Sequence, residues 1–364
     1  MPRSFIISVP GKLFISGEWA VLEPENPAIV VAVKKRIFAK ITNSQDKKIH
    51  LSLKNYNLKN LKAEFKKGHL HFLKKLKPEE EKLLIFARKA IEVGLRYLGK
   101  WKPFRIELWA KNKEKIGFGF SAASSVAIIA ALLKFNKEKL EKEKIFKLAS
   151  LSHFFAQGKL GSGADIVASV YGGYLACHGI NVNWLKKQVK KERDMRKIVE
   201  MPWPNFYVEK LNLPKELKLL VGWTGRPSST PELIKKIKSW QKKAPKAYKK
   251  IISDISRTTK KMILSLREKN KKQILNLIKE NEKYLKELSK KSGTEIVTEK
   301  LKILSEIAER FGGAGKIAGA GGGDCGICLV SSQKRADKIK KEWRKNGIIP
   351  LKIKIDHSGV GLSS

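Results

Sequence analysis

The segment 113–135 limits the fold more than any other part of the chain. A charged loop leads into Gly117 and Gly119, small residues fill positions 121–125, and an apolar run of helix formers occupies 127–133. Glycine lets a backbone turn tightly, and small hydroxyl side chains favour a helix start. The N–H groups at such a start carry about half a positive charge, which suits phosphate. The segment predicts a loop and an apolar helix, with either a phosphate site or a plain tight turn between them. It is not a Walker loop, because no Gly-Lys-Ser/Thr closes it.

Two further glycine-rich segments, 158–173 and 312–326, lie far from the first. The third contains AGAGGGDCG, where glycines and alanines between Lys316 and Asp324 leave the backbone almost bare. A bare backbone helps most where a ligand must come close. Each loop alone fits a structural role, but three together suggest a phosphate-rich ligand held by several walls.

Phosphoryl transfer requires positioning and charge neutralisation, usually with a metal ion that bridges the phosphates. Lys12 follows Pro10-Gly11, which predicts a tight turn, and Asp165 precedes an apolar helix in GSGAD. Ser121 or Ser124 offers a hydroxyl to Mg²⁺. Taken singly, Lys12 also fits a surface turn and Asp165 an acid that favours a helix N-terminus. Spacing alone does not show that they meet.

The length of 364 residues allows two domains, and the charge is strongly basic, with 77 Lys and Arg against 34 Asp and Glu, a net +43. This charge attracts polyanions and anionic substrates. The excess is spread over nearly the whole chain, which favours solvated helix faces over a dedicated nucleic-acid stripe. No apolar run is long enough for a bilayer span, and MPRSFIISVPGK is interrupted too early for a signal peptide. The sequence predicts a cytoplasmic protein.

Three cysteines at 177, 325 and 328 fit a reducing compartment. Cys325 and Cys328 form a C-x-x-C, but no second pair or His cluster completes a zinc site, which favours a structural role. His69 and His71 share one face of an extended segment, and we expect both at the surface. The other histidines are scattered without ligand spacing.

The pattern of apolar residues predicts strands, then helices, then a second group of both. A domain boundary is expected in residues 180–215, which are basic, interrupted by prolines and expected to be irregular. Strands are expected at 4–9, 28–33, 37–42, 104–110, 217–223 and 350–355, helices at 83–98, 143–157, from 231, and at 333–345, and helical structure at 246–311 with breaks near 270 and 292–293. The two domains are expected at residues 1–205 and 206–364.

Three motifs in order, PGKLFISGEWAVL, GFGFSAASSVA and KIAGAGGGDCGI, resemble the signature motifs of the GHMP kinase superfamily. Two further segments, GSGADIVASVYGGYLAC and VGWTGRPSST, resemble its bacterial and archaeal phosphomevalonate kinase branch. The resemblance covers most of the chain. It implies an α+β fold with an ATP-binding N-terminal domain like domain 2 of ribosomal protein S5 and a ferredoxin-like C-terminal domain, with ATP and the acceptor between them.

The resemblance also implies roles for residues that match the motifs. Lys12 and Asp165 would be catalytic, and Ser121 would lie near Mg²⁺. The residues implied for the ATP phosphates are Lys115, Gly117, Gly119, Ser121, Ala122, Ala123, Ser124 and Ser125. The residues implied for the acceptor are Lys12, Glu18, Ser162, Thr224, Ser228, Ser229, Thr230, Gly319, Ala320, Gly321, Gly322 and Gly323. One departure is Phe120, which replaces the first serine of the usual pair in the middle motif.

The implied reaction moves the γ-phosphoryl group of ATP onto the phosphate of (R)-5-phosphomevalonate, giving (R)-5-diphosphomevalonate in the mevalonate pathway of isoprenoid biosynthesis. Because a phosphate monoester is already largely ionised near neutral pH, Asp165 would orient Lys12 or steady the metal rather than remove a proton. Another GHMP enzyme, a mevalonate kinase or a sugar kinase, is the nearest alternative. A basic nucleic-acid-binding protein is a remote one, because no reader motif is present. We expect small-molecule partners and no membrane, and a homodimer stays open.

Overall fold

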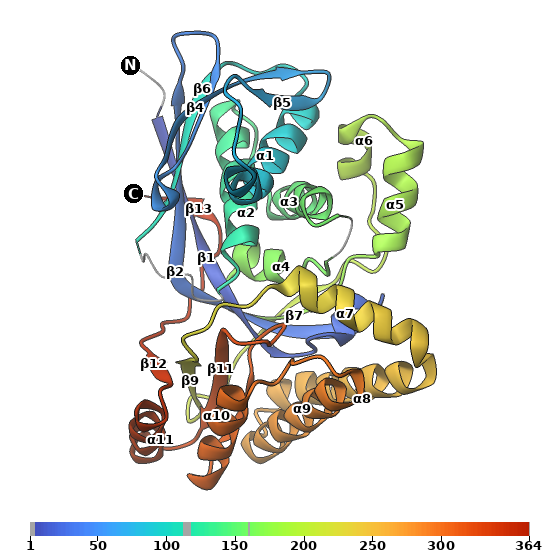
Figure 1. Cartoon of the computed structure of the whole chain (residues 1–364), viewed down its shortest axis with the longest axis vertical. Coiled ribbons are helices and arrows are strands. Elements are labelled where there is room, and N and C mark those ends of the chain that lie inside the picture. The colour runs from blue at the N-terminus through green and yellow to red at the C-terminus, as the bar shows by residue number, and fades with distance from the viewer. Residues whose placement is uncertain (1–3, 112–117, 159–160, 364) are drawn as a thin grey trace.

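Two β-sheets organise the chain in the computed structural model, which describes residues 4–111, 118–158 and 161–363 (Figure 1). Within these ranges the larger sheet has nine strands in the order β13-β1-β2-β6-β3-β4-β5, and β7 and β8 extend it from β2. Its strands are β1 (Ser4–Ser16), β2 (Pro27–Asn43), β3 (Ile49–Leu53), β4 (Leu58–Lys66), β5 (His69–Phe72), β6 (Phe104–Ala110), β7 (Tyr174–His178), β8 (Val208–Leu211) and β13 (Gly361–Leu362).

The first two strands are longer than the sequence pattern predicts. The turn expected at Pro10-Gly11 is wrong, because β1 continues through both residues with only a shift in its pairing register against β2. Such a bulge bends a strand without reversing it. The strands expected at 28–33 and 37–42 are likewise one strand, β2, which pairs with β1 along nearly its whole length. Lys12 therefore lies on a strand and not on a tight turn.

A layer of helices covers one face of the larger sheet (Figure 1). These helices are α1 (Pro78–Leu98), α2 (Phe120–Phe135), α3 (Lys142–Ala156) and α4 (Ala164–Tyr171). The helix predicted at 143–157 and the strand predicted at 104–110 are confirmed as α3 and β6. The apolar run of α2 is buried from Val126 to Leu133, so this helix forms the centre of the core. Because α2 is held in the core, the position of Gly119 at its N-terminus is fixed as well.

The region expected to be irregular contains two short helices, α5 (Val182–Lys191) and α6 (Met195–Glu200). That expectation was wrong because the local signals are side-chain caps rather than an apolar stripe. The Asn181 side chain accepts from Trp184 N at 3.0 Å, and the Asp194 side chain accepts from Arg196 N at 2.9 Å. Only Leu185 of α5 is buried, so the basic face dominates its sequence.

The smaller sheet has the antiparallel order β10-β11-β9-β12. Its strands are β9 (Lys218–Trp223), β10 (Ala314–Ile317), β11 (Cys325–Val330) and β12 (Ile349–Leu351), and its helices are α7 (Thr230–Lys243), α8 (Pro245–Arg267), α9 (Lys271–Ser292), α10 (Glu299–Arg310) and α11 (Gln333–Lys345). The predicted helical breaks are confirmed: Asn270 caps α9, and Gly293 ends it with a φ of +63°. The helix predicted at 333–345 is α11, whereas the last predicted strand is shorter, as β12.

Apolar residues from both sheets share a second core. Leu13 and Val31 of the larger sheet belong to the same buried cluster as Leu277 and Ile327. After the smaller sheet the chain returns to the larger one, where β13 pairs with β1. In addition, β8 pairs with β7, so this pairing crosses the expected domain boundary at 205/206. That boundary stays a prediction. The shared core therefore joins the larger sheet to the smaller one.

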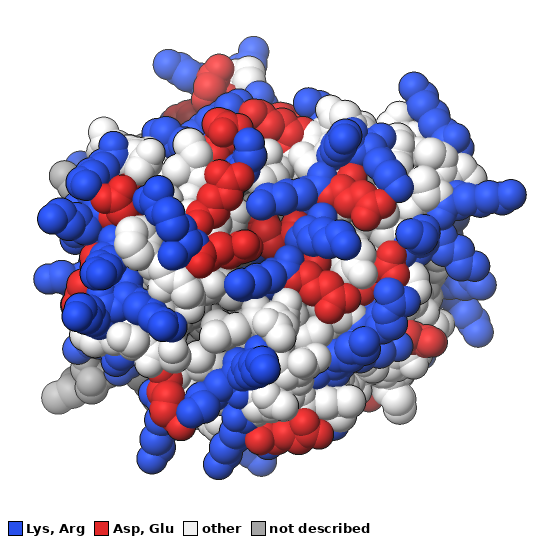
Figure 2. Space-filling model, turned by 90° about the horizontal axis from the view of Figure 1, so that it is seen from below, with Lys and Arg blue, Asp and Glu red and all other residues white. Residues whose placement is uncertain are grey.

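The cysteines expected to be structural and the histidines expected at the surface lie where the sequence predicts. Cys325 and Cys328 are free and buried in β11, and His69 and His71 are exposed on β5. On the face seen from below the view of Figure 1, Lys and Arg side chains are spread over the whole surface, with acidic side chains between them (Figure 2). Within the described ranges, no helix has the length and apolar character that crossing a bilayer requires.

Candidate active site

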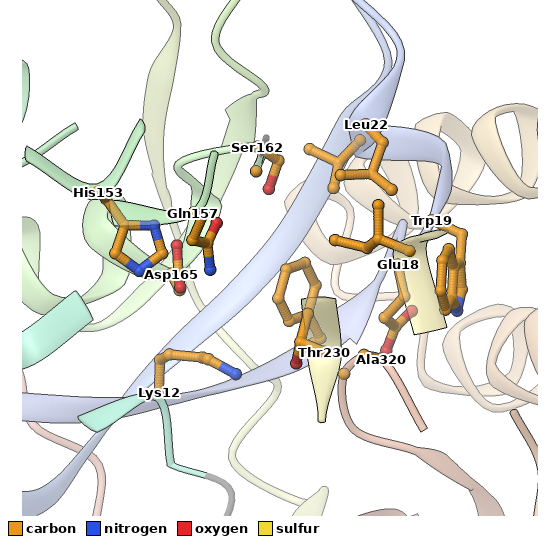
Figure 3. A pocket seen from close by; sticks show the side chains of 15 residues that line it. Lys12, Glu18, Trp19, Leu22, His153, Gln157, Ser162, Asp165, Thr230 and Ala320 are labelled. Carbon is orange, nitrogen blue, oxygen red and sulfur yellow. The ribbon is translucent and has the colours of Figure 1, made fainter. Parts of the chain in front are cut away.

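A pocket lies where β1, α3, α4, α7 and the third glycine loop meet, and we call it the central pocket (Figure 3). The space in it that no protein atom occupies is about 610 Å³, with open solvent at its mouth included. Its lining residues are Lys12, Phe14, Glu18, Trp19, Val21, Leu22, His153, Gln157, Gly161, Ser162, Asp165, Thr230, Ile234, Gly319 and Ala320. The structure therefore brings together Lys12 and Asp165, which the sequence alone leaves apart.

The side chain of Lys12 passes between two glycine-rich loops. A Cβ atom at Gly119 would lie 2.7 Å from Lys12 Cε, and one at Gly319 would lie 3.9 Å from Lys12 Nζ. The backbone N–H of Lys12 donates to the carbonyl of Phe118 at 2.9 Å. The loop before α2 and the loop after β10 thus converge on one ammonium group. Such a cation between two bare backbones suits closely spaced phosphates.

Asp165 faces the same space from the first turn of α4 (Figure 3). Its Oδ1 accepts from Ile166 N at 3.0 Å, so the helix start holds the carboxylate. Ser162 lies just before this helix and also lines the central pocket. The central pocket therefore contains a cation, Lys12 on β1, and an anion, Asp165 on α4, and both come from the N-terminal half of the chain.

A second pocket, which we call the aromatic pocket, lies at the start of α2, and the space in it that no protein atom occupies is about 900 Å³, with open solvent at its mouth included. Its lining residues are Ile37, Leu53, Asn55, Tyr56, Leu83, Phe86, Ala87, Leu108, Trp109, Ala110, Phe120, Ser121 and Ser124. Apolar and aromatic walls with a few polar groups are typical of small-molecule sites. The two pockets adjoin, because the Phe86 ring contacts the His153 ring of the central pocket at a centroid distance of 4.9 Å.

The residues expected to hold ATP phosphates lie in different surroundings. Ser121 is exposed and Ser124 half-buried, and both face the aromatic pocket from the first turns of α2. Ser125 is buried, and its hydroxyl donates to the carbonyl of Ser121 at 3.2 Å, while Ala122 and Ala123 are in the core. Gly119 caps the helix with a φ of +71°. Lys115 and Gly117 lie outside the described residues.

On the acceptor side, Thr230, Gly319 and Ala320 line the central pocket, whereas Thr224 does not. Thr224 is buried, and both its N–H and its hydroxyl donate to the carbonyl of Asp324, at 2.9 and 3.0 Å. Thr224 therefore ties the loop after β9 to the third glycine loop.

Two neighbouring serines take different positions. Ser229 occupies the N-cap position of α7, and the hydroxyl of Ser228 is buried with no hydrogen-bond partner in the described part of the chain.

Burial raises the pKa of Asp324 to about 6, against the opposing effect of the Lys12 charge. The acidic end of the third loop is thus sensitive to the cation in the pocket.

The remaining glycines of the third loop face protein. A Cβ atom at Gly321 would lie 2.1 Å from the carbonyl oxygen of Ile296, and one at Gly323 would lie 2.5 Å from that of Arg226. A Cβ at Gly322 would lie 3.0 Å from the Leu233 side chain. These three positions shape the loop, and their contact with an acceptor stays a prediction.

Glu18 lines the central pocket, but its carboxylate is already engaged. Oε1 accepts from Lys316 Nζ, and both side chains are buried, with exposed fractions of 2% and 0%. Oε2 has no partner among the described residues. Because Lys316 is on β10, directly before the third glycine loop, this ion pair joins the end of β1 to the base of that loop.

Among the lining residues of the central pocket that the sequence reasoning did not name as site residues are Trp19, His153 and Gln157. Trp19 has a φ of +66°, a strained backbone for a large side chain, and such strain is often found at functional sites. His153 and Gln157 come from the end of α3 and reach the pocket beside Asp165 (Figure 3). A lone histidine in an amphipathic helix carries no sequence signal, because neither a second ligand nor a motif accompanies it.

The sequence pattern of the GHMP kinases N terminal domain matches residues 85–173, and that of the GHMP kinases C terminal domain matches residues 262–349. A phosphomevalonate kinase from Streptomyces sp. strain CL190 is 31% identical over 96% of this chain and 97% of its own length. The chain belongs to the GHMP kinase family. It is therefore a kinase, and its two-domain α+β fold is the GHMP kinase fold.

Solved structures of other proteins have the same fold. A Lin0012 protein from Listeria innocua has a TM-score of 0.88 and 32% identity, with all of both chains covered. The phosphomevalonate kinase of Streptococcus pneumoniae in complex with phosphomevalonate and AMPPNP has a TM-score of 0.81 and 21% identity, covering 96% of this chain and 99% of that one. At this identity the second likeness concerns the fold alone.

Proposed function

We propose that this GHMP kinase transfers the γ-phosphoryl group of ATP to the phosphate of (R)-5-phosphomevalonate, giving (R)-5-diphosphomevalonate. The observation that carries the proposal is the position of Lys12, whose side chain passes between Gly119 and Gly319 in a pocket that Asp165 shares. The Streptomyces relative, named phosphomevalonate kinase and matched over nearly its full length, supports this acceptor.

In this proposal the aromatic pocket takes the nucleoside of ATP and the central pocket takes the acceptor. Trp109 and Phe120 offer flat apolar surface to a base, and Ser121 and Ser124 stand where the phosphates would reach the α2 N-terminus. Residues 1–205 would then form the ATP-binding domain. Residues 206–364 supply Thr230 and the third glycine loop to the acceptor side.

The acceptor is a phosphate monoester, which is largely a dianion near neutral pH and needs little help from a base. The main barrier is the repulsion between donor and acceptor phosphates. Lys12, which lies between the two glycine loops, offsets the repulsion between the phosphates, and Asp165 keeps the Lys12 ammonium group oriented. Preorganised charge of this kind supplies much of the rate enhancement in phosphoryl transfer.

The residues present fit a Mg²⁺ ion that arrives with the nucleotide. The structure holds no group of three or more His, Cys, Asp or Glu side chains with metal-binding geometry in its described ranges. Mg²⁺ usually keeps several waters and binds one or two protein oxygens together with substrate phosphates. The exposed hydroxyl of Ser121 would be such a ligand, and the ion would neutralise the β- and γ-phosphates when bound.

The acceptor is tested by measuring ADP release from ATP with phosphomevalonate, mevalonate, galactose and homoserine. We expect turnover with phosphomevalonate far above the others. Lys12→Ala and Asp165→Ala should each lower kcat at least about 100-fold, as when one preorganised charge or donor is removed. Lys34→Ala, on the exposed part of β2, is the matched control and should keep kcat. Equal turnover with mevalonate, or an active Lys12→Ala variant, would contradict the proposal.

A further inference from the structure

His153 is a buried polar side chain whose role the mechanism above does not use. It lies in the last turn of α3 and is only 4% exposed. Its Nε2 has no hydrogen-bond partner among the described residues. Leaving a buried polar group unpaired costs roughly 1–3 kcal/mol, so such a group calls for an explanation.

The position of this ring connects the two pockets. His153 lines the central pocket, and its ring contacts Phe86, which lines the aromatic pocket. In the proposed function, the nucleotide and the acceptor occupy the pockets on either side of this ring contact. In the close view the ring lies beside Asp165 (Figure 3).

The charged groups that act on His153 are Asp165 of α4 and Lys12 of β1. Burial lowers the pKa of His153, the Lys12 charge lowers it further, and the Asp165 charge opposes both effects. The imidazole is accordingly neutral at physiological pH, with one N–H to donate. A neutral ring adds no third charge to the Lys12 and Asp165 pair.

We propose that His153 is a positioning residue for phosphoryl transfer: its Nε2–H donates to the Asp165 carboxylate once both substrates are bound, and this bond keeps the carboxylate turned toward Lys12. Hydrogen bonds in active sites are often loose without substrates and tighten in the reacting complex. The inference rests on the proposed function and assigns no proton transfer to His153.

The test compares three substitutions that differ in which ring nitrogen they replace. His153→Gln places an amide near the position of Nε2, His153→Asn places one near Nδ1, and His153→Leu removes both. A small misplacement in a site of this kind costs about 100-fold in rate. We expect His153→Leu to lower kcat by about this factor with little change in the KM of either substrate. His153→Gln should recover much more activity than His153→Asn.

His178 provides the matched control. Its ring packs on Tyr207 at 4.8 Å and its buried Nδ1 lacks a partner in the described chain, but it lines neither pocket. His178→Leu should therefore keep kcat, with thermal melting recorded for every variant. If His153→Leu does not fold, the relative kcat values of His153→Gln and His153→Asn test the inference instead.

Two results would overturn the inference. One is an His153→Leu variant within about twofold of wild type, since a positioning residue costs far more. The other is an Asn variant as active as the Gln variant. Failure of the proposed function would look different, because the wild type itself would then not turn over phosphomevalonate, and the inference would fall with it.

Discussion

Replacing Glu282 with glutamine should stabilise the protein above neutral pH and remove part of its pH dependence. Glu282 lies on α9 and is 1% exposed, and its Oε2 accepts from Ile317 N at 3.2 Å, at the base of the third glycine loop. Burial raises the pKa of Glu282 to about 7, although Lys286 and Lys316 oppose the rise. The folded chain thus keeps a proton that the unfolded chain releases.

The sign and size follow from this difference. The folded pKa lies above the ordinary value of 4.5, so the free energy of unfolding falls as pH rises from about 4.5 to about 7. At about 1.4 kcal/mol per pH unit, the loss above neutral pH is at most about 3 kcal/mol. Glutamine keeps an acceptor for Ile317 N but carries no charge. Glu282→Gln should therefore exceed wild type by up to about this amount at pH 8 and match it near pH 4.

Urea unfolding followed by circular dichroism between pH 4.5 and 8.5 measures the difference. Glu287→Gln on the same helix is the matched control with the opposite sign, because Lys291 holds the pKa of Glu287 below its usual range. That variant should be less stable than wild type at neutral pH, and the difference should fade in acid. A Glu282→Gln variant that differs from wild type by the same amount at every pH, or is the less stable at pH 8, would refute the reasoning.

Two further predictions concern the walls of the central pocket. Lys316→Met leaves Glu18 as an uncompensated buried charge and should lower the free energy of unfolding by about 3–5 kcal/mol. The double variant Glu18→Gln/Lys316→Met should recover most of that loss. Equal urea midpoints for the single and double variants would contradict the pairing. Gly119→Ala should cost about 1–2 kcal/mol from its left-handed backbone and also lower kcat, because its Cβ would displace Lys12. Gly225→Ala is the control, with a φ of +82° and nothing within 4 Å of its Cβ, and should show a similar backbone cost without the loss of kcat.

The sequence predicted most elements that have a clear apolar period. The helix α3, the strand β6 and the breaks around α9 are confirmed. The pattern failed where tertiary pairing overrides local signals. Pro10-Gly11 is typical of a turn, yet pairing with β2 carries β1 straight through it. α5 was missed because Leu185 is its one buried side chain.

The candidate site could be predicted only as separate parts. The motifs indicated Lys12 and Asp165, but spacing along the chain does not show that two residues share a pocket. Glu18 was expected at the acceptor, and its bond to Lys316 could not be foreseen, because nothing local links residues so far apart. His153 carries no motif at all. Its significance comes from its burial and from its ring contact with Phe86, which links a wall of the central pocket to a wall of the aromatic pocket.

The glycine loops also show why a motif overstates what touches the substrate. Gly119 leaves room for the Lys12 side chain, because a Cβ atom there would lie 2.7 Å from Lys12 Cε, so bare backbone at this position serves the charge in the pocket. Gly321 and Gly323 instead allow close approach to backbone carbonyls of other loops, so bare backbone there serves packing. Both requirements select glycine and are indistinguishable in a sequence. In the proposed mechanism the reactive part of the third loop is its start, which the buried Glu18–Lys316 and Glu282–Ile317 contacts hold against the end of β1 and against α9, and its end is the frame that keeps the start in place.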